Sequence, residues 1–361
     1  MMLKNLFLFR SDKVWQITVL LIPFVMLSLA ASCDRSGTAG SQGGDEQDNL
    51  DSLALLENAS ERITRLSEAI VENPDVASLY LERGLEFRES NNAMALSDIK
   101  KAWLLDSGNS VINRALADQY MEMGDSRAAL GVLNRHIGNK PEDLNALWDL
   151  ANMATVIKQY QASNGAVSQI LRLDVQNAEA YYLRGRNFRL MGDTADAISA
   201  YQTAIEVNPD FIQPYLELGV ILSAQEDPRA LRYLDNVLQM DSLNDIARYQ
   251  IAKFHQDAGN LNEAVEAYEE IVRLSPQNDD ALYNLGTIFY GVDSLQTAMR
   301  YFDLTTKVSP ARAMAHYGKA LCAIGLGQNK DAALYAQQAY NLDSELDFAI
   351  ELADSLRATL N

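Results

Sequence analysis

The side chains that could support catalysis or metal binding are few and scattered along the chain. The three histidines are His136, His255 and His316, and no HExxH pattern or other metal-binding spacing joins them. Besides Cys33, the only cysteine is Cys322. Phosphate-binding and nucleophile motifs of the GxGxxG, GxxxxGK[ST] and GxSxG types are absent. The sequence therefore indicates a protein that is not an enzyme and that needs no cofactor or metal ion.

Carboxylates are abundant, and adjacent pairs such as Glu269-Glu270 and Asp279-Asp280 could resemble a catalytic pair. The chain, however, holds 49 acidic and 30 basic residues, so such pairs are expected on any solvated face. A surface this negative repels phosphate backbones, which excludes general nucleic-acid binding. The charge can attract basic partners, or it can simply keep a long chain soluble.

The elements that must carry these residues are helices. Hydrophobic residues make up 48% of the chain, and proline is scarce at 8 residues, which favours a helical chain over a turn-rich β protein. Segments 178–211, 245–278 and 279–312 align without gaps. Each divides into a helix, a short turn and a second helix. In the first segment, the positions that define this pattern are Tyr181, Gly185, Phe188, Gly192, Asp193, Ala197, Tyr201, Ala204 and Pro209.

These positions resemble the tetratricopeptide repeat, which has a large residue at position 4, a small one at 8 and an aromatic one at 11. The second helix carries Ala at 20, an aromatic residue at 24, Ala at 27 and Pro at 32. Eight units stay in register, and the units that start at Ala77 and Ile212 are one residue short in the turn. The units start at Ala77, Ser110, Leu144, Ala178, Ile212, Asp245, Asp279 and Ala313.

The resemblance implies an all-α fold, a right-handed α-solenoid of about eight helix–turn–helix units with a C-terminal capping helix. In repeat register the histidines fall at positions 27, 11 and 4 and Cys322 at position 10, so all four are expected to be packed side chains rather than ligands. The expected organisation is a signal segment (1–33), a flexible tether (34–49), a helical half-repeat (50–76), eight repeats (77–346) and the cap (347–361).

The amino terminus has the order of an export signal. Lys4, Arg10 and Lys13 precede an apolar run from Val14 to Leu29, and small residues then lead to Cys33. This order resembles a bacterial lipoprotein signal, in which the cysteine is acylated, although Ala30 stands where that pattern usually has Leu. Cleavage near residue 31 and an uncleaved anchor are the alternatives. We expect an extracytoplasmic chain in the bacterial cell envelope, lipid-anchored to a membrane, with the outer membrane favoured.

In this family, positions 2, 5, 9, 12 and 13 of the first helix face a concave groove. Five of the eight residues at position 5 are aromatic, and basic residues lie nearby, which suits recognition of a peptide or a partner helix. The alternative is that a position-5 tyrosine packs between repeats. The predicted partner-binding residues are Leu81, Trp148, Tyr182, Arg186, Arg189, Tyr249, Lys253, Tyr283, Tyr290 and Tyr317.

These features predict a membrane-tethered, non-catalytic scaffold that binds a protein or peptide in its groove and serves assembly or maintenance of the cell envelope. The pattern favours no particular oligomeric state. One alternative is a lipoprotein that binds peptidoglycan or another glycan through its aromatic residues, and another is an enzyme. Binding to purified cell-wall sacculi would separate the glycan-binding protein from a protein-only adaptor.

Overall fold

The structure of the protein is a computed structural model that describes the backbone of residues 58–360. The expected signal segment, the tether and Cys33 lie outside the described residues, as does the beginning of the expected half-repeat. The described residues form helices and no strand. No helix in this part of the chain is both long enough and apolar enough to cross a membrane.

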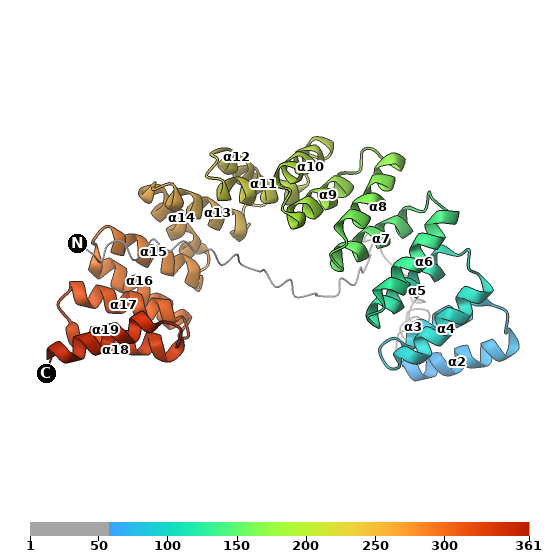
Figure 1. The fold of residues 1–361 in the computed structure, drawn as a ribbon, viewed down its shortest axis with the longest axis horizontal. Coiled ribbons are helices and arrows are strands. Elements are labelled where there is room, and N and C mark those ends of the chain that lie inside the picture. The colour runs from blue at the N-terminus through green and yellow to red at the C-terminus, as the bar shows by residue number, and fades with distance from the viewer. Residues whose placement is uncertain (1–57, 361) are drawn as a thin grey trace, which may run out of the picture. The chain divides into compact units, whose positions relative to one another are not determined.

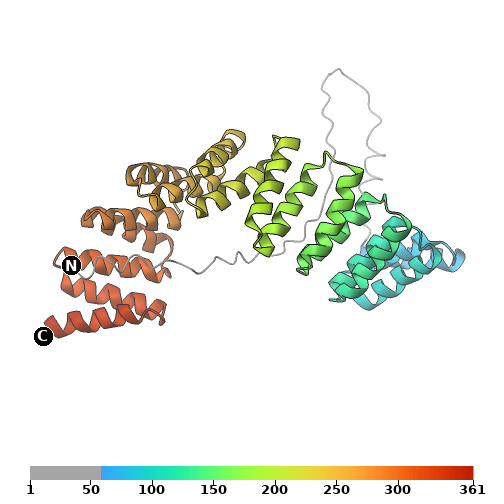
Figure 2. The same cartoon turned by 45° about the horizontal axis from the view of Figure 1, so that its top comes forward.

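Eighteen helices follow one another along residues 58–360, and Figures 1 and 2 show them stacked in chain order. Their bounds are α2 (Ala59–Glu72), α3 (Ala77–Phe87), α4 (Asn92–Leu105), α5 (Ser110–Glu122), α6 (Ser126–Asn139), α7 (Leu144–Val156), α8 (Tyr160–Leu173), α9 (Ala178–Met191), α10 (Thr194–Val207), α11 (Ile212–Ala224), α12 (Arg229–Met240), α13 (Asp245–Asp257), α14 (Leu261–Leu274), α15 (Asp279–Gly291), α16 (Leu295–Val308), α17 (Ala313–Gly325), α18 (Asn329–Leu342) and α19 (Asp347–Leu360).

The helices from α3 to α18 form eight consecutive pairs, which we call repeats 1 to 8, with a helix A and a helix B in each. Every helix A begins at the residue where the sequence places the start of a repeat. Each helix packs most extensively on its chain neighbours. The fold is therefore the expected all-α solenoid, in which each repeat buries its apolar face against the next.

Helix A is started by the same device in most repeats. An Asn or Asp stands immediately before the helix and accepts a hydrogen bond from a backbone N–H of the first turn, which satisfies a donor that has no partner inside the helix. Such a cap contributes roughly 1 kcal/mol to helix stability. The capping residues are Asn109, Asp143, Asn177, Asn244 and Asn278.

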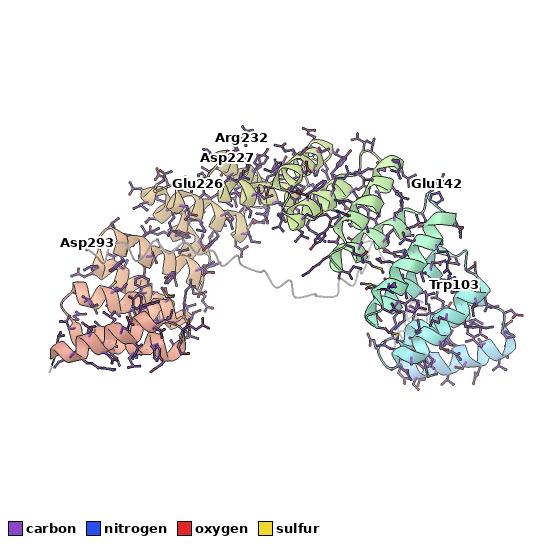
Figure 3. The ribbon with its side chains drawn as sticks, in the orientation of Figure 1. Trp103, Glu142, Glu226, Asp227, Arg232 and Asp293 are labelled. Atoms are coloured by element: carbon purple, nitrogen blue, oxygen red, sulfur yellow. The ribbon has the colours of Figure 1, made fainter. Side chains whose placement is uncertain are left out.

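The turn between helices A and B contains a left-handed residue at position 15 in repeats 2 to 8 (Gly124, Lys158, Gly192, Glu226, Gly259, Asp293 and Gly327). Glycine adopts this conformation without strain, whereas an ordinary residue such as Lys158 or Glu226 is disfavoured there by roughly 1–2 kcal/mol. Figure 3 marks Glu226 and Asp293 at two of these turns. In repeat 1 the turn between α3 and α4 contains no such residue.

Within a repeat, an aromatic residue of helix B packs on a glycine of helix A. A Cβ atom at Gly185 would lie 2.7 Å from the ring of Tyr201, and one at Gly286 would lie 2.7 Å from the ring of Phe302. The ring of Phe302 is also within 2.7 Å of a Cβ placed at Gly318 in the next repeat. Glycine is therefore required at these positions because any side chain would collide with a fully buried ring.

The two sides of the array are not equivalent. Helices A of neighbouring repeats approach each other in the pairs α5–α7, α11–α13 and α15–α17, whereas no two helices B come equally close. Helices A therefore line the narrower side, and gaps between helices B open on the other side. The last helix, α19, packs on α18 and buries Ala349 and Ala353, which covers the apolar surface of repeat 8.

Candidate functional site

The narrower side presents positions 2, 5, 6, 9, 12 and 13 of the helices A, and we call this surface the A face. It carries the predicted aromatic residues at position 5. Three of them pair with the position-24 ring of their own repeat, and all three are only half-buried. The ring centroids are 5.7 Å apart for Tyr182 and Tyr201, 5.9 Å for Tyr249 and Tyr268, and 5.7 Å for Tyr283 and Phe302.

One side of each of these rings therefore packs in the core, and one edge of the ring is exposed on the A face. Burial raises the pKa of Tyr182, Tyr249 and Tyr283 above the usual tyrosine value, so their hydroxyls are neutral at physiological pH. A half-buried tyrosine offers a partner an apolar edge and a hydrogen-bonding hydroxyl. Trp148 is half-buried in the same way and packs against the core around α7.

The first and last predicted members of this row present little surface. Leu81 is 9% exposed, and Tyr317 is 8% exposed because its ring packs edge-on against Phe348 of α19 at 4.8 Å. Tyr290 is half-buried and packs against the core around Phe302. The accessible aromatic edges thus belong to the middle of the array, from repeat 3 to repeat 7.

The junction of repeats 6 and 7 contains a neutral hydrogen-bond network below the A face. The Tyr268 hydroxyl donates to Gln256 Oε1 at 2.9 Å and accepts from Asn284 Nδ2 at 3.1 Å. The same amide also donates to the Tyr249 hydroxyl at 3.1 Å. No buried polar atom of these four side chains lacks a partner, which rigidifies the junction.

The junction of repeats 4 and 5 holds charged groups at the same register positions. Arg189 forms an ion pair with Glu217 at 3.2 Å. Burial raises the pKa of Glu217, and the nearby charges of Arg189 and Arg186 oppose this only in part. The Tyr201 hydroxyl is buried and forms no hydrogen bond of good geometry, although the Arg189 guanidinium lies close to it. Burial, followed by the charge of Glu217, raises the pKa of Tyr201 far above its usual value.

The three predicted basic residues differ in how their charge is balanced. Arg189 is paired with Glu217, and exposed Lys253 is paired with Asp257 one turn later at 2.8 Å. Half-buried Arg186 makes neither a hydrogen bond nor an ion pair with the described residues, although Glu217 lies close enough to feel its charge. Arg186 is therefore the A-face cation of these three that is available to an external carboxylate.

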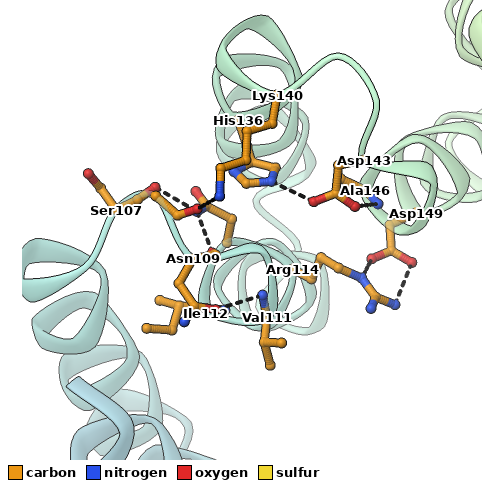
Figure 4. A network of polar contacts seen from close by, with 12 residues as sticks. Ser107, Asn109, Val111, Ile112, Arg114, His136, Lys140, Asp143, Ala146 and Asp149 are labelled. Carbon is orange, nitrogen blue, oxygen red and sulfur yellow. Dashed lines mark hydrogen bonds and ion pairs between the residues drawn. The ribbon is translucent and has the colours of Figure 1, made fainter. Parts of the chain in front are cut away.

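The A face of the first three repeats carries paired charges that the sequence analysis did not single out. Arg114 at position 5 forms an ion pair with Asp149 of the next repeat, as Figure 4 shows. Asp118 lies nearby, and its pKa is raised by burial and then by the charge of Asp149. Arg88 reaches Glu122 at 3.8 Å. Asp149, Asp118 and Glu122 stand at positions 6, 9 and 13 of their repeats, so opposite charges at such positions were a readable signal.

Two of the three histidines, His136 and His316, make polar contacts within the array. Buried His136 contacts Asp143 Oδ2 through Nε2 at 2.8 Å, and Asp143 also caps α7 (Figure 4). His316 contacts Gln338 and the Pro310 carbonyl. Within residues 58–360, no three side chains of His, Cys, Asp or Glu are grouped to hold a metal ion. Burial raises the pKa of Cys322 to about 12, which makes its thiol unreactive at neutral pH.

Comparisons with known proteins identify the repeat. Models described as TPR repeat and tetratricopeptide repeat match residues 253–292, 178–211 and 283–346, and the match at 178–211 covers repeat 4. The TPR repeat-containing protein YvcD of Bacillus subtilis is 28% identical over 171 residues, which are 46% of this chain and 34% of that protein. The peroxisomal targeting signal receptor of Kluyveromyces lactis is 24% identical over 224 residues, 59% of this chain and 39% of the receptor.

The regions matched thus span only about a third of the length of these relatives. Among solved structures, the C-terminal part of a TPR repeat-containing protein from Cytophaga hutchinsonii has a TM-score of 0.53 and 16% identity. The match covers 65% of this chain and 98% of that chain. At this identity, the likeness shows a shared fold.

Proposed function

Because the chain is a tetratricopeptide repeat protein, a class of protein–protein interaction scaffolds, we propose that it binds a peptide segment of a partner protein on the A face of repeats 4 to 7. The observation that carries this proposal is the combination of half-buried aromatic edges with one uncompensated cation, Arg186. Tyrosine and arginine are the side chains that most often supply binding energy at protein interfaces.

The chemistry of the partner follows from these side chains. The edges of Tyr182, Tyr249 and Tyr283 suit aliphatic or aromatic side chains, and Arg186 suits a carboxylate with which it can form two parallel hydrogen bonds. The expected ligand is therefore a segment that carries an acidic residue beside apolar ones. One relative is, by its name, a receptor for a peroxisomal targeting signal.

A peptide-display selection against the purified protein tests this proposal. We expect enrichment of peptides that combine Asp or Glu with apolar residues, and loss of these sequences when Arg186→Glu is used as the target. Arg232→Glu is the matched control, because Arg232 is exposed on a helix B, away from the A face (Figure 3). Enrichment of the same peptides by the Arg186→Glu and unmodified proteins would overturn the proposal.

We further propose that the scaffold is held at a membrane of the bacterial cell envelope by acylation of Cys33, where it serves assembly or maintenance of the envelope. The order of basic residues, apolar run and Cys33 supports this. In a bacterial host, globomycin is expected to block removal of the leader and so cause an unprocessed precursor to accumulate. The Cys33→Ala variant should show no such response, and processing that ignores globomycin would contradict acylation.

A further inference from the structure

The wider side of the array contains a cavity that is separate from the A face. It has a volume of about 370 Å³ and is lined by residues of α8 and α10, the helices B of repeats 3 and 4, and of α9, the helix A between them. This volume falls within the range of small-molecule sites. Its lining residues are Asn164, Ser168, Tyr181, Arg184, Phe188, Asp196, Ser199, Ala200 and Thr203.

Helix B of repeat 4 carries a small residue, Ala200, at register position 23 in the wall of the cavity. In repeats 5 and 7 this position holds a tyrosine that spans the gap to the preceding helix B. Tyr233 accepts a hydrogen bond from Gln202 at 3.4 Å, and Tyr301 donates to Glu269 at 3.0 Å. Ala200 has no side chain long enough to span the gap, so the space between α8 and α10 stays open.

A cation without a carboxylate partner lies in this cavity. Three repeats carry a basic residue at position 7, and two of these are neutralised. Arg83 contacts Asp98 at 2.7 Å, and Lys319 contacts Asp303 at 2.7 Å. Arg184, the third, contacts only the neutral hydroxyl of Ser168 at 3.1 Å and lies over the Tyr181 ring.

Other hydrogen-bond donors surround the guanidinium of Arg184. The Oδ1 atom of Asn164 accepts from buried Asn187 at 2.9 Å, which leaves the Nδ2 group of Asn164 as a donor toward the cavity. The Ser199 hydroxyl has no partner among the described residues. Asp196, an exposed residue of the lining, is the one acid there and makes no ion pair with Arg184.

We propose that this cavity binds a small oxyanion, such as a phosphate or carboxylate group, through Arg184, Asn164 and Ser199. Guanidinium groups bind both kinds of oxyanion through charge-assisted hydrogen bonds. The overall negative charge of the chain does not prevent this, because repulsion beyond about 8 Å is screened at physiological salt. The site is independent of the A face, since α9 presents Arg184 and Arg186 to opposite sides of the array.

The test is a titration of the full chain with inorganic phosphate, and separately with acetate, followed by calorimetry or ligand-observed NMR at constant ionic strength. We expect saturable binding of at least one of these anions and at least tenfold weaker binding by Arg184→Gln. Ser168 stands at the register position of Asp303, which pairs with Lys319. The Ser168→Asp variant should therefore pair with Arg184 in the same way and abolish anion binding. Preference for phosphate or acetate distinguishes a phosphate ligand from a carboxylate ligand.

Two further variants separate the site from a general charge effect. Ala200→Tyr reproduces the filled gap of repeats 5 and 7, so it should remove binding without loss of thermal stability. Arg232→Gln removes the same charge from an exposed position of α12, outside the cavity lining, and should leave binding unchanged. Failure of both anions to bind, or equal weakening by Arg184→Gln and Arg232→Gln, would overturn the proposal.

Discussion

The junction of repeats 4 and 5 and the junction of repeats 6 and 7 use the same three register positions in different ways. Both place a tyrosine of helix B, Tyr201 or Tyr268, between two helices A, and both rings are fully buried. Around Tyr268 the neighbours are amides, and its hydroxyl makes two hydrogen bonds. Around Tyr201 the neighbours are Arg189 and Glu217, and its hydroxyl makes none.

The difference between the two junctions separates the residues that stabilise the array from the residues that remain available to a partner. Both repeats combine the buried ring with a small residue at position 8 of helix A, Gly185 in repeat 4 and Ala252 in repeat 6, so these positions supply the stability. The polar groups beside the ring vary. Where these polar groups form hydrogen bonds with one another, as in repeats 6 and 7, none of them is left to bind a partner. Where they are charged and incompletely matched, as in repeats 4 and 5, Arg186 remains able to bind a partner.

The largest expected effect on stability comes from disturbing the packing of an aromatic ring on a glycine. Gly286→Ala places a methyl group 2.7 Å from the ring of Phe302, which cannot retreat because Gly318 lies on its other side. We expect a loss of about 3 kcal/mol in the free energy of unfolding, measured by chemical denaturation. Gly131→Ala is the matched control, because its methyl group meets no atom within 4 Å. That variant should be about 0.5–1 kcal/mol more stable, since alanine is favoured over glycine inside a helix.

A smaller loss is expected when the neutral network is opened. Tyr268→Phe leaves the ring in place but removes the hydroxyl that bonds Gln256 and Asn284. The variant should lose about 1–2 kcal/mol, because the carbonyl of Gln256 then stays buried without a donor. An unchanged midpoint of denaturation would show that the network contributes nothing to stability.

The same substitution in the charged junction should have the opposite sign. Tyr201→Phe removes a buried hydroxyl that has no hydrogen-bond partner. We expect the variant to be as stable as the unmodified protein or more stable by up to about 1 kcal/mol. If Tyr201→Phe and Tyr268→Phe destabilised the protein equally, the contrast between the two junctions would be wrong.

The smallest effect is a pH dependence that belongs to Glu217. Burial raises its pKa in the folded state, so between its unfolded and folded pKa values the folded protein binds more protons than the unfolded one. Stability from this group therefore increases as the pH falls through the folded pKa toward the ordinary value of 4.5. Compared with Glu217→Gln, the unmodified protein should gain stability on acidification from pH 7 to pH 5. A constant difference between the two proteins over this range would contradict the assignment.

Much of the fold could be predicted because residues close together in the sequence determine where each helix of a repeat begins and ends. The starts of the eight helices A, from Ala77 to Ala313, and the start of α19 at Asp347 coincide with the expected positions. The caps and glycine turns that set these boundaries act over a few residues, so a single sequence displays them. The left-handed conformation of the non-glycine turn residues, such as Lys158, could not be recognised from residue type, because such side chains rarely adopt it.

The candidate site was less predictable because exposure depends on partners far along the chain. Position 5 carries the same residue type in Tyr182 and Tyr317, yet Phe348 of the cap covers only Tyr317. The balance of charge at Arg186 likewise depends on a residue of the following repeat, Glu217. Ala200 lines the cavity beside Arg184, but Ala166 and Ala267 occupy the same register position in other repeats, so the sequence alone does not locate the cavity.

The central claim is that the A face of the middle repeats binds the partner, and site-specific photo-crosslinking in living cells tests it most directly. A photoreactive residue is placed at Gln213 or Lys253, which are exposed on helices A, or at Arg232, which is exposed on a helix B. The account predicts discrete adducts from the first two positions, lost when Arg186→Glu is added, and no adduct from Arg232. Adducts from Arg232 alone, or adducts at Gln213 and Lys253 that persist with Arg186→Glu, would contradict it.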